Sequence, residues 1–87
     1  MRKVVITPKA FKEFTKWADE DRRVLVKIVL LINDIQRSPF EGIGKPEPLK
    51  HDFQGVWSRK ITGEHRLLYR VDDEQITVSA CRFHYQK

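Results

Sequence analysis

Apolar residues recur along the chain with two different periods, and the change of period divides the sequence in two. Up to Arg37 they recur every three or four positions, which is typical of amphipathic helices. From Val56 onward they recur every second position, which is typical of strands that bury one face. A stretch that holds glycines and prolines separates the halves. The pattern predicts an α+β domain with its helices first and its antiparallel strands last.

Two helices are predicted in the first half. Thr7 and Pro8 form a typical helix start, with threonine as the N-cap and proline at the first helical position. The acidic run 19–21 ends this helix and caps a second one, from about residue 22 to residue 37, which a Ser-Pro pair ends. The apolar stripe of the first helix is expected to lie in the core and consists of Phe11, Phe14, Trp17 and Ala18.

The strands are predicted to form one antiparallel meander. Three runs of alternating residues, 56–61, 65–71 and 76 to about 85, are joined by short polar turns. The β-branched run 4–6 is a fourth, N-terminal strand that can add to the sheet. The two helices are expected to cover one face of this sheet, so residues 1–87 make a single domain.

The charge balance narrows the class of partner. The chain holds 17 lysines and arginines against 12 aspartates and glutamates, which gives a formal net charge of +5. In so small a domain this excess favours a polyanion, nucleic acid before membrane. No apolar run approaches the roughly 20 residues of a membrane-spanning helix, so no membrane association is expected.

The metal-binding and redox residues are sparse. Cys81 is the single cysteine, so neither an internal disulfide nor a cysteine metal site is expected, which fits a reducing cytoplasm. The thiol follows an alanine in a predicted strand and is expected to be a buried small hydrophobic group. The three histidines lack paired metal-ligand spacing, so no metal is expected.

Residues 40–55 follow neither period and are predicted to form a long ordered loop. Loops of this length in small domains are usually functional or disordered, and Pro46 and Pro48 stiffen the backbone around Glu47. This acid lies in a region whose other charges are mostly positive. The basic positions on the loop and strands are Lys45, Lys50, Arg59, Lys60, Arg66 and Arg82.

Aromatic residues are interleaved with these basic positions. Trp57, Phe83 and Tyr85 could stack on bases while lysines and arginines hold phosphates, as in nucleic-acid surfaces. The alternative is that the arginines are solvated or paired with carboxylates.

Four of these residues suggest a hypothesis for RNA cleavage. Glu47 could take the proton of a ribose 2′-hydroxyl, and His84, which titrates near neutral pH, could protonate the leaving 5′-oxygen. Arg66 could neutralise charge on the five-coordinate phosphate, and Tyr85 could orient the phosphate or stack on a base. The alternative is a solvated loop acid and a solvated chain terminus.

Four segments of the chain resemble the YoeB (Txe) toxins of the RelE superfamily of toxin–antitoxin ribonucleases. The segments run from the Pro-Phe-Glu-Gly stretch at 39–51 through 55–61 and 64–69 to Ala-Cys-Arg-Phe-His-Tyr at 80–85. The resemblance implies a RelE-like fold and a toxin that cuts mRNA in the ribosomal A site, without metal or other cofactor, by 2′-hydroxyl attack.

The resemblance also assigns roles to residues. It implies Glu47 as general base, Arg66 as phosphate-stabilising residue, His84 as general acid and Tyr85 as supporting residue. The positions expected to bind RNA or the ribosome are Lys45, Lys50, His51, Arg59, Lys60 and Arg82.

The implied partners are a YefM-like antitoxin, the ribosome with its mRNA, and a second copy of the chain in a homodimer. Operator DNA is expected to be bound only through the antitoxin complex. The chain departs from the family where Phe83 replaces a common tyrosine, Lys60 a frequent arginine, and two residues follow Tyr85. A non-catalytic RNA- or partner-binding module, and a nuclease active on free RNA, remain alternatives. Alanine at Glu47 or His84 would separate binding from cleavage.

Overall fold

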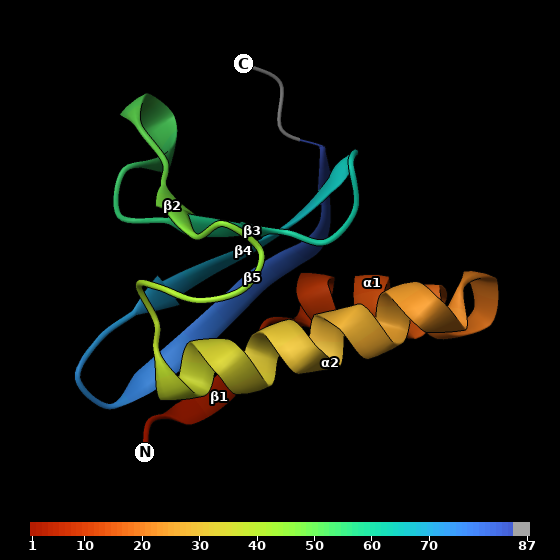
Figure 1. Cartoon of the computed structure of the whole chain (residues 1–87), viewed down its shortest axis with the longest axis horizontal. Coiled ribbons are helices and arrows are strands. Elements are labelled where there is room, and N and C mark those ends of the chain that lie inside the picture. The colour runs from red at the N-terminus through yellow and green to blue at the C-terminus, as the bar shows by residue number, and fades with distance from the viewer. Residues whose placement is uncertain (85–87) are drawn as a thin grey trace.

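The computed structural model describes residues 1–84 and shows two helices packed on one face of a five-stranded sheet (Figure 1). The sheet order is β1-β5-β4-β3-β2. The elements in chain order are β1 (Lys3–Ile6), α1 (Pro8–Glu20), α2 (Arg22–Arg37), β2 (Glu47–Pro48), a 3₁₀ turn (His51–Phe53), β3 (Trp57–Lys60), β4 (His65–Val71) and β5 (Gln75–His84).

The sheet is larger than predicted, and it is mixed. Strands β3, β4 and β5 pair antiparallel in sequence order, as expected. However, β1 runs parallel to β5, and the Thr7 N–H bonds to the Val78 carbonyl where the chain leaves β1 for α1. The predicted loop also contributes β2, which pairs with β3 at the edge of the sheet. Pro48 is tolerated there because an edge strand need not donate a hydrogen bond on its outer side.

Both helices begin at the predicted caps. The Thr7 hydroxyl accepts from the Ala10 N–H at 3.2 Å, and the Asp21 carboxylate accepts from the Arg23 N–H at 3.1 Å. Trp17 is buried, as expected. Phe14 is partly buried against the core, but the expectation is wrong for Phe11, which is 56% exposed, and for Ala18, which is also exposed. The α1 positions that face the sheet are those of Ala10 and Trp17.

A β-bulge in β5 changes which side chains face the helices. Arg66 pairs with Phe83, yet Leu68 pairs with Ala80, so Leu67 lies opposite two residues of β5. Those two residues, Cys81 and Arg82, both turn toward α1: the Cys81 thiol lies 3.5 Å from the Ala10 carbonyl oxygen, and Arg82 lies over Trp17. Phe83 is thereby directed to the other face.

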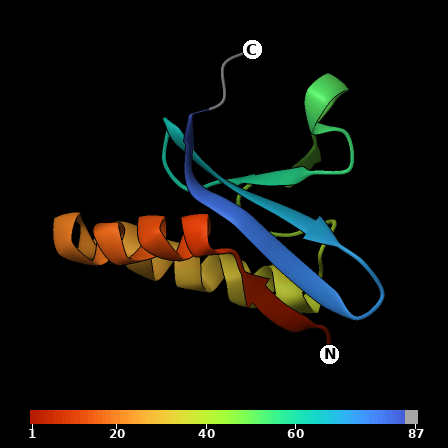
Figure 2. The same ribbon diagram turned by 180° about the vertical axis from the view of Figure 1, so that it is seen from behind.

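That other face, which we call the open face, carries a second small apolar cluster. It consists of Leu49, Val56, Leu68 and Ala80, with Phe83 packed against them. The Phe53 and Phe83 rings meet edge-on with centroids 5.4 Å apart, which ties the 3₁₀ turn to β5. Figures 1 and 2 show this turn at the end of the molecule away from the two helices. Neither helix within residues 1–84 is long and apolar enough to cross a membrane.

Candidate functional site

Two cross-strand rows of residues on the open face bring the predicted site residues together. In the first row, Glu47 of β2 pairs with Ser58 of β3. In the second, Lys60 of β3 pairs with Arg66 of β4, and Arg66 pairs with Phe83 of β5. Ser58 and Lys60 are two positions apart on one strand, so the rows lie side by side on the same face. The register therefore places a carboxylate and two basic side chains on one surface.

Glu47 is held by backbone contacts on both sides. Upstream, the Lys60 N–H bonds to the Gly44 carbonyl at 2.7 Å, and downstream the Leu49 N–H bonds to the Val56 carbonyl at 2.8 Å. The Glu47 side chain is partly exposed. Strands β2 and β4 are two strand spacings apart, about 10 Å, and Arg66 lies one row along from Glu47, so Lys60 on β3 stands between the two.

His84 lies at the end of β5, on a different part of the surface. It pairs with His65, and the two rings have centroids 5.7 Å apart. His65 in turn meets the buried Trp17 ring edge-on at 5.0 Å. The exposed His84 Nε2 lies 3.3 Å from the Glu64 carboxylate. The register thus places His84 on the helix side, and the bulge that turns Phe83 outward separates it from Glu47 and Arg66.

Arg59 does not belong to the surface, and the prediction that it binds RNA is wrong. Its side chain is fully buried. The guanidinium forms an ion pair with Asp34 of α2, and its Nε donates to the Tyr69 hydroxyl at 3.2 Å. It is buried because Arg59 and Ser58 point to opposite faces of β3, and Arg59 takes the face covered by α2. The hydrogen bond from Arg59 lowers the pKa of Asp34, whereas burial raises the pKa of Tyr69.

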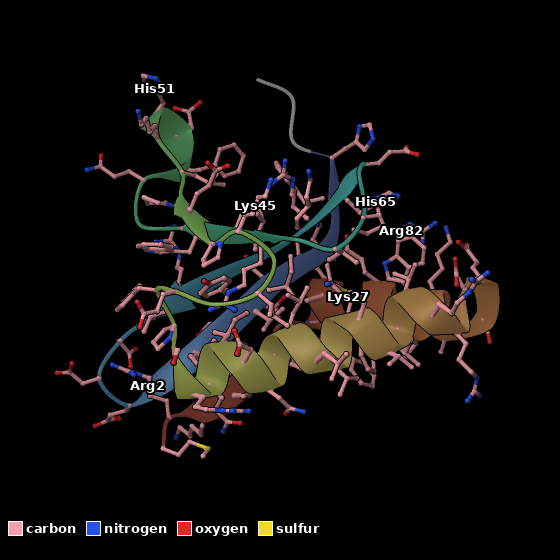
Figure 3. The ribbon with its side chains drawn as sticks, in the orientation of Figure 1. Arg2, Lys27, Lys45, His51, His65 and Arg82 are labelled. Carbon is pink, nitrogen blue, oxygen red and sulfur yellow. The ribbon has the colours of Figure 1, made fainter. Side chains whose placement is uncertain are left out.

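The remaining predicted residues are spread over two regions. Lys45, Lys50 and His51 are exposed, and Lys45 and His51 have positive φ angles of 52° and 58°. Figure 3 shows His51 at the outer tip of the 3₁₀ turn, away from Arg82. Arg82 lies beside α1, paired with Glu20 at 2.6 Å. Tyr85, the predicted supporting residue, lies outside the described residues.

Sequence reasoning missed two polar residues near the site. The Ser58 hydroxyl, opposite Glu47, is buried and has no hydrogen-bond partner within residues 1–84. Glu64 lies in the β3–β4 turn and contacts His84. Alternation along β3 places Ser58 on the open face, so the sequence pattern could have identified this serine. The contact between Glu64 and His84 depends on the bulge in β5 and could not be predicted in this way.

The described part of the chain offers an open surface and no enclosed site. Residues 1–84 form no pocket, and among them no three histidine, cysteine, aspartate or glutamate side chains are grouped so that they could hold a metal ion.

The chain is similar to known toxins over nearly its whole length. The family model of the YoeB-like toxin of bacterial type II toxin–antitoxin systems matches residues 6–85. The toxin YoeB of Escherichia coli (strain K12) is 48% identical over 83 residues, which cover 95% of this chain and 99% of that protein.

Solved structures give the same result. The YoeB dimer from Staphylococcus aureus matches with a TM-score of 0.90 at 40% identity, covering 97% of this chain and 98% of that chain. The heterotetrameric YoeB–YefM toxin–antitoxin complex from the same organism matches with a TM-score of 0.87 at 40% identity, covering 98% and 99%. The chain belongs to the YoeB-like toxins of bacterial type II toxin–antitoxin systems.

Proposed function

We propose that this toxin is a ribosome-dependent endoribonuclease that cleaves mRNA in the A site and so inhibits translation. Toxins of its family are known as ribonucleases, and the observation that carries the proposal here is the arrangement on the open face. Glu47 lies in the row beside Lys60 and Arg66, so a carboxylate and two cations surround one surface on which a phosphodiester can bind.

In the proposed reaction Glu47 takes the proton from the ribose 2′-hydroxyl, whose oxygen attacks the adjacent phosphorus. Arg66 donates hydrogen bonds to the phosphate as negative charge develops on it. The bond to the 5′-oxygen breaks, His84 protonates that oxygen, and a cyclic phosphate is left. The His84 side chain is 54% exposed at the end of β5, so in this proposal the RNA extends from the open face around the end of that strand to reach the ring. Tyr85 is the proposed supporting residue.

In this proposal the ribosome holds the mRNA in place against the exposed charges of the open face. Lys45, Lys50, His51 and Lys60 supply exposed or partly exposed contacts to RNA. The step needs no metal, since Arg66 and Lys60 supply the positive charge.

The proposed partners follow from the family. A YefM-like antitoxin neutralises the toxin, in keeping with the YoeB–YefM complex of the S. aureus relative. A homodimer is proposed by analogy with the S. aureus dimer. Operator DNA is bound only through the antitoxin, and the toxin acts where ribosomes are, in the cytoplasm.

The test is a purified translation reaction on a defined mRNA, mapped by primer extension. The proteins compared are the wild type, Glu47→Ala, His84→Ala and, as a control, Glu74→Ala, which removes an exposed turn acid away from the open face. A new 5′ end in the A-site codon with the wild type and the control, and its loss in the two site variants, supports the proposal.

The second candidate function is a non-catalytic RNA-binding module, which the exposed basic residues would equally serve. In that case folded wild-type protein binds ribosomes but yields no new 5′ end. Cleavage of mRNA without ribosomes would instead remove the ribosome requirement and leave the nuclease assignment.

A further inference from the structure

Arg59 is a buried cation on β3, the strand that pairs with the Glu47 strand β2. Its side chain has no exposed surface, and each of its five N–H groups has an acceptor. An ion pair with Asp34 would by itself balance the charge. The other acceptors satisfy the remaining N–H groups, which are costly to bury unpaired, and their positions show which segment of the chain the guanidinium holds.

Three of these acceptors are backbone carbonyls of one loop. Arg59 Nη1 donates to Ile43 O at 3.1 Å, and Nη2 donates to Ser38 O at 2.6 Å and Glu41 O at 3.1 Å. The Tyr69 hydroxyl, which accepts from Arg59, donates in turn to Pro39 O at 2.7 Å. The loop 38–44 is thus wrapped around one guanidinium and its tyrosine partner.

Strand β3, which carries Arg59, also contacts the end of this loop and the strand that follows it. Ser58 pairs with Glu47, and the N–H of Lys60 bonds to the Gly44 carbonyl. Three consecutive residues of β3 therefore fix loop 38–44 and the strand that follows it. Only two residues, Lys45 and Pro46, separate the end of this loop from Glu47.

We propose that Arg59 is a positioning residue for the cleavage reaction and acts through Glu47; this rests on the proposed function. The guanidinium sets the path of loop 38–44, and this path sets where Glu47 and Lys45 lie relative to Arg66. Lysine cannot replace the arginine here, since an ammonium lacks the planar fork that reaches several carbonyls at once.

The experiment is a double-mutant cycle in the ribosome cleavage assay, using Arg59→Lys, Glu47→Ala and the double variant under single-turnover conditions. Arg59→Lys keeps the cation for Asp34 but loses the fork, and a misplaced base is expected to slow cleavage by about 10- to 100-fold. Ribosome affinity should stay within about twofold of the wild type, because the exposed lysines are unchanged. The control is Arg23→Lys, an exposed arginine on α2, which should cleave at the wild-type rate.

The cycle separates positioning from general stability. If Arg59 acts through Glu47, adding Arg59→Lys to Glu47→Ala should change the residual rate by less than about twofold. A full additional loss in the double variant would overturn the proposal, as would wild-type cleavage by folded Arg59→Lys. Full activity of Glu47→Ala alone would instead remove the general base of the proposed function, and the positioning role with it.

A second variant covers the case in which Arg59→Lys does not fold. Tyr69→Phe removes the hydroxyl that links Arg59 to the Pro39 carbonyl and keeps the buried ring. It should slow cleavage in the same direction with unchanged ribosome affinity, and the loss should again vanish in the Glu47→Ala background. A wild-type rate for Tyr69→Phe, or a loss that persists in that background, would contradict the proposal.

Discussion

Asp34, in the last turn of α2, accepts a hydrogen bond from the buried guanidinium of Arg59 on β3. The same carboxylate oxygen accepts from the Ile43 N–H at 3.1 Å. These bonds favour the charged form and lower the pKa of Asp34, with the bond from Arg59 as the largest cause. Helix, strand and loop thus meet at one ion pair.

This ion pair should make the fold sensitive to acid. Because the pKa of Asp34 is lower in the folded than in the unfolded chain, its contribution is complete above the ordinary aspartate pKa of about 3.9. It is lost as the pH falls through the lowered value. The Tm of Asp34→Asn should therefore differ most from that of the wild type near neutral pH, and the two should converge as the pH falls through the lowered pKa of Asp34. A constant difference across the acid range would contradict this assignment.

A side chain at Gly42 should disrupt the same junction. Gly42 has a φ of 131°, and a Cβ there would lie 2.1 Å from the Asp34 carboxylate oxygen. Gly42→Ala should lower the free energy of unfolding by about 1–3 kcal/mol, measured by urea denaturation. Gly63→Ala is the matched control, since a Cβ at Gly63 meets nothing within 4 Å. Equal stabilities for the two variants would show that Gly42 carries no such constraint.

The sequence predicts the helices well because their signals are local. The Thr-Pro start and the Ser-Pro stop lie next to the residues that they affect, and the helices are found at 8–20 and 22–37. The strands β3 and β4 follow equally from alternation. The parallel pairing of β1 escapes prediction because its partner β5 lies at the other end of the chain. The edge strand β2 escapes prediction because it is only two residues long and shows no alternation.

The sequence pattern also predicts only part of the candidate site. Lys60 and Arg66 share a face that alternation implies, whereas Glu47 joins them only through β2, which alternation does not predict. By contrast, the acceptors of Arg59 include three backbone carbonyls, and carbonyls leave no side-chain pattern. The bulge opposite Leu67 has no sequence signal that alternation detects, so the helix-side positions of Arg82 and His84 are visible only in the structure.

The Cys81 thiol should be unreactive in the folded toxin. Its side chain is buried, and burial is the main cause that raises its pKa to about 12. The thiol therefore stays protonated across the physiological range, and the thiolate is the reactive form. Labelling with a disulfide reagent at about pH 8, below the ordinary thiol pKa of about 8.5, should be slow in native protein and fast in denaturant. Rapid labelling of native protein would contradict the buried placement.

Arg82 should support the fold more than it binds RNA. Its guanidinium lies 4.1 Å from the centroid of the buried Trp17 ring and forms an ion pair with Glu20. Replacing it with alanine removes both contacts and should lower the free energy of unfolding by about 1 kcal/mol. Glu20→Gln is the matched variant, since it weakens the exposed ion pair and keeps the cation on the ring.

The two roles predict different measurements for Arg82→Ala. A supporting residue should change the urea midpoint while ribosome affinity and its salt dependence stay as in the wild type. A residue that contacts phosphate should lower affinity and reduce the slope of log K against log salt by roughly one unit. Because the guanidinium lies over Trp17 and is paired with the Glu20 carboxylate, a phosphate would compete with that carboxylate for it. We therefore expect the salt slope to be unchanged, and a reduced slope would restore Arg82 to the RNA-binding surface.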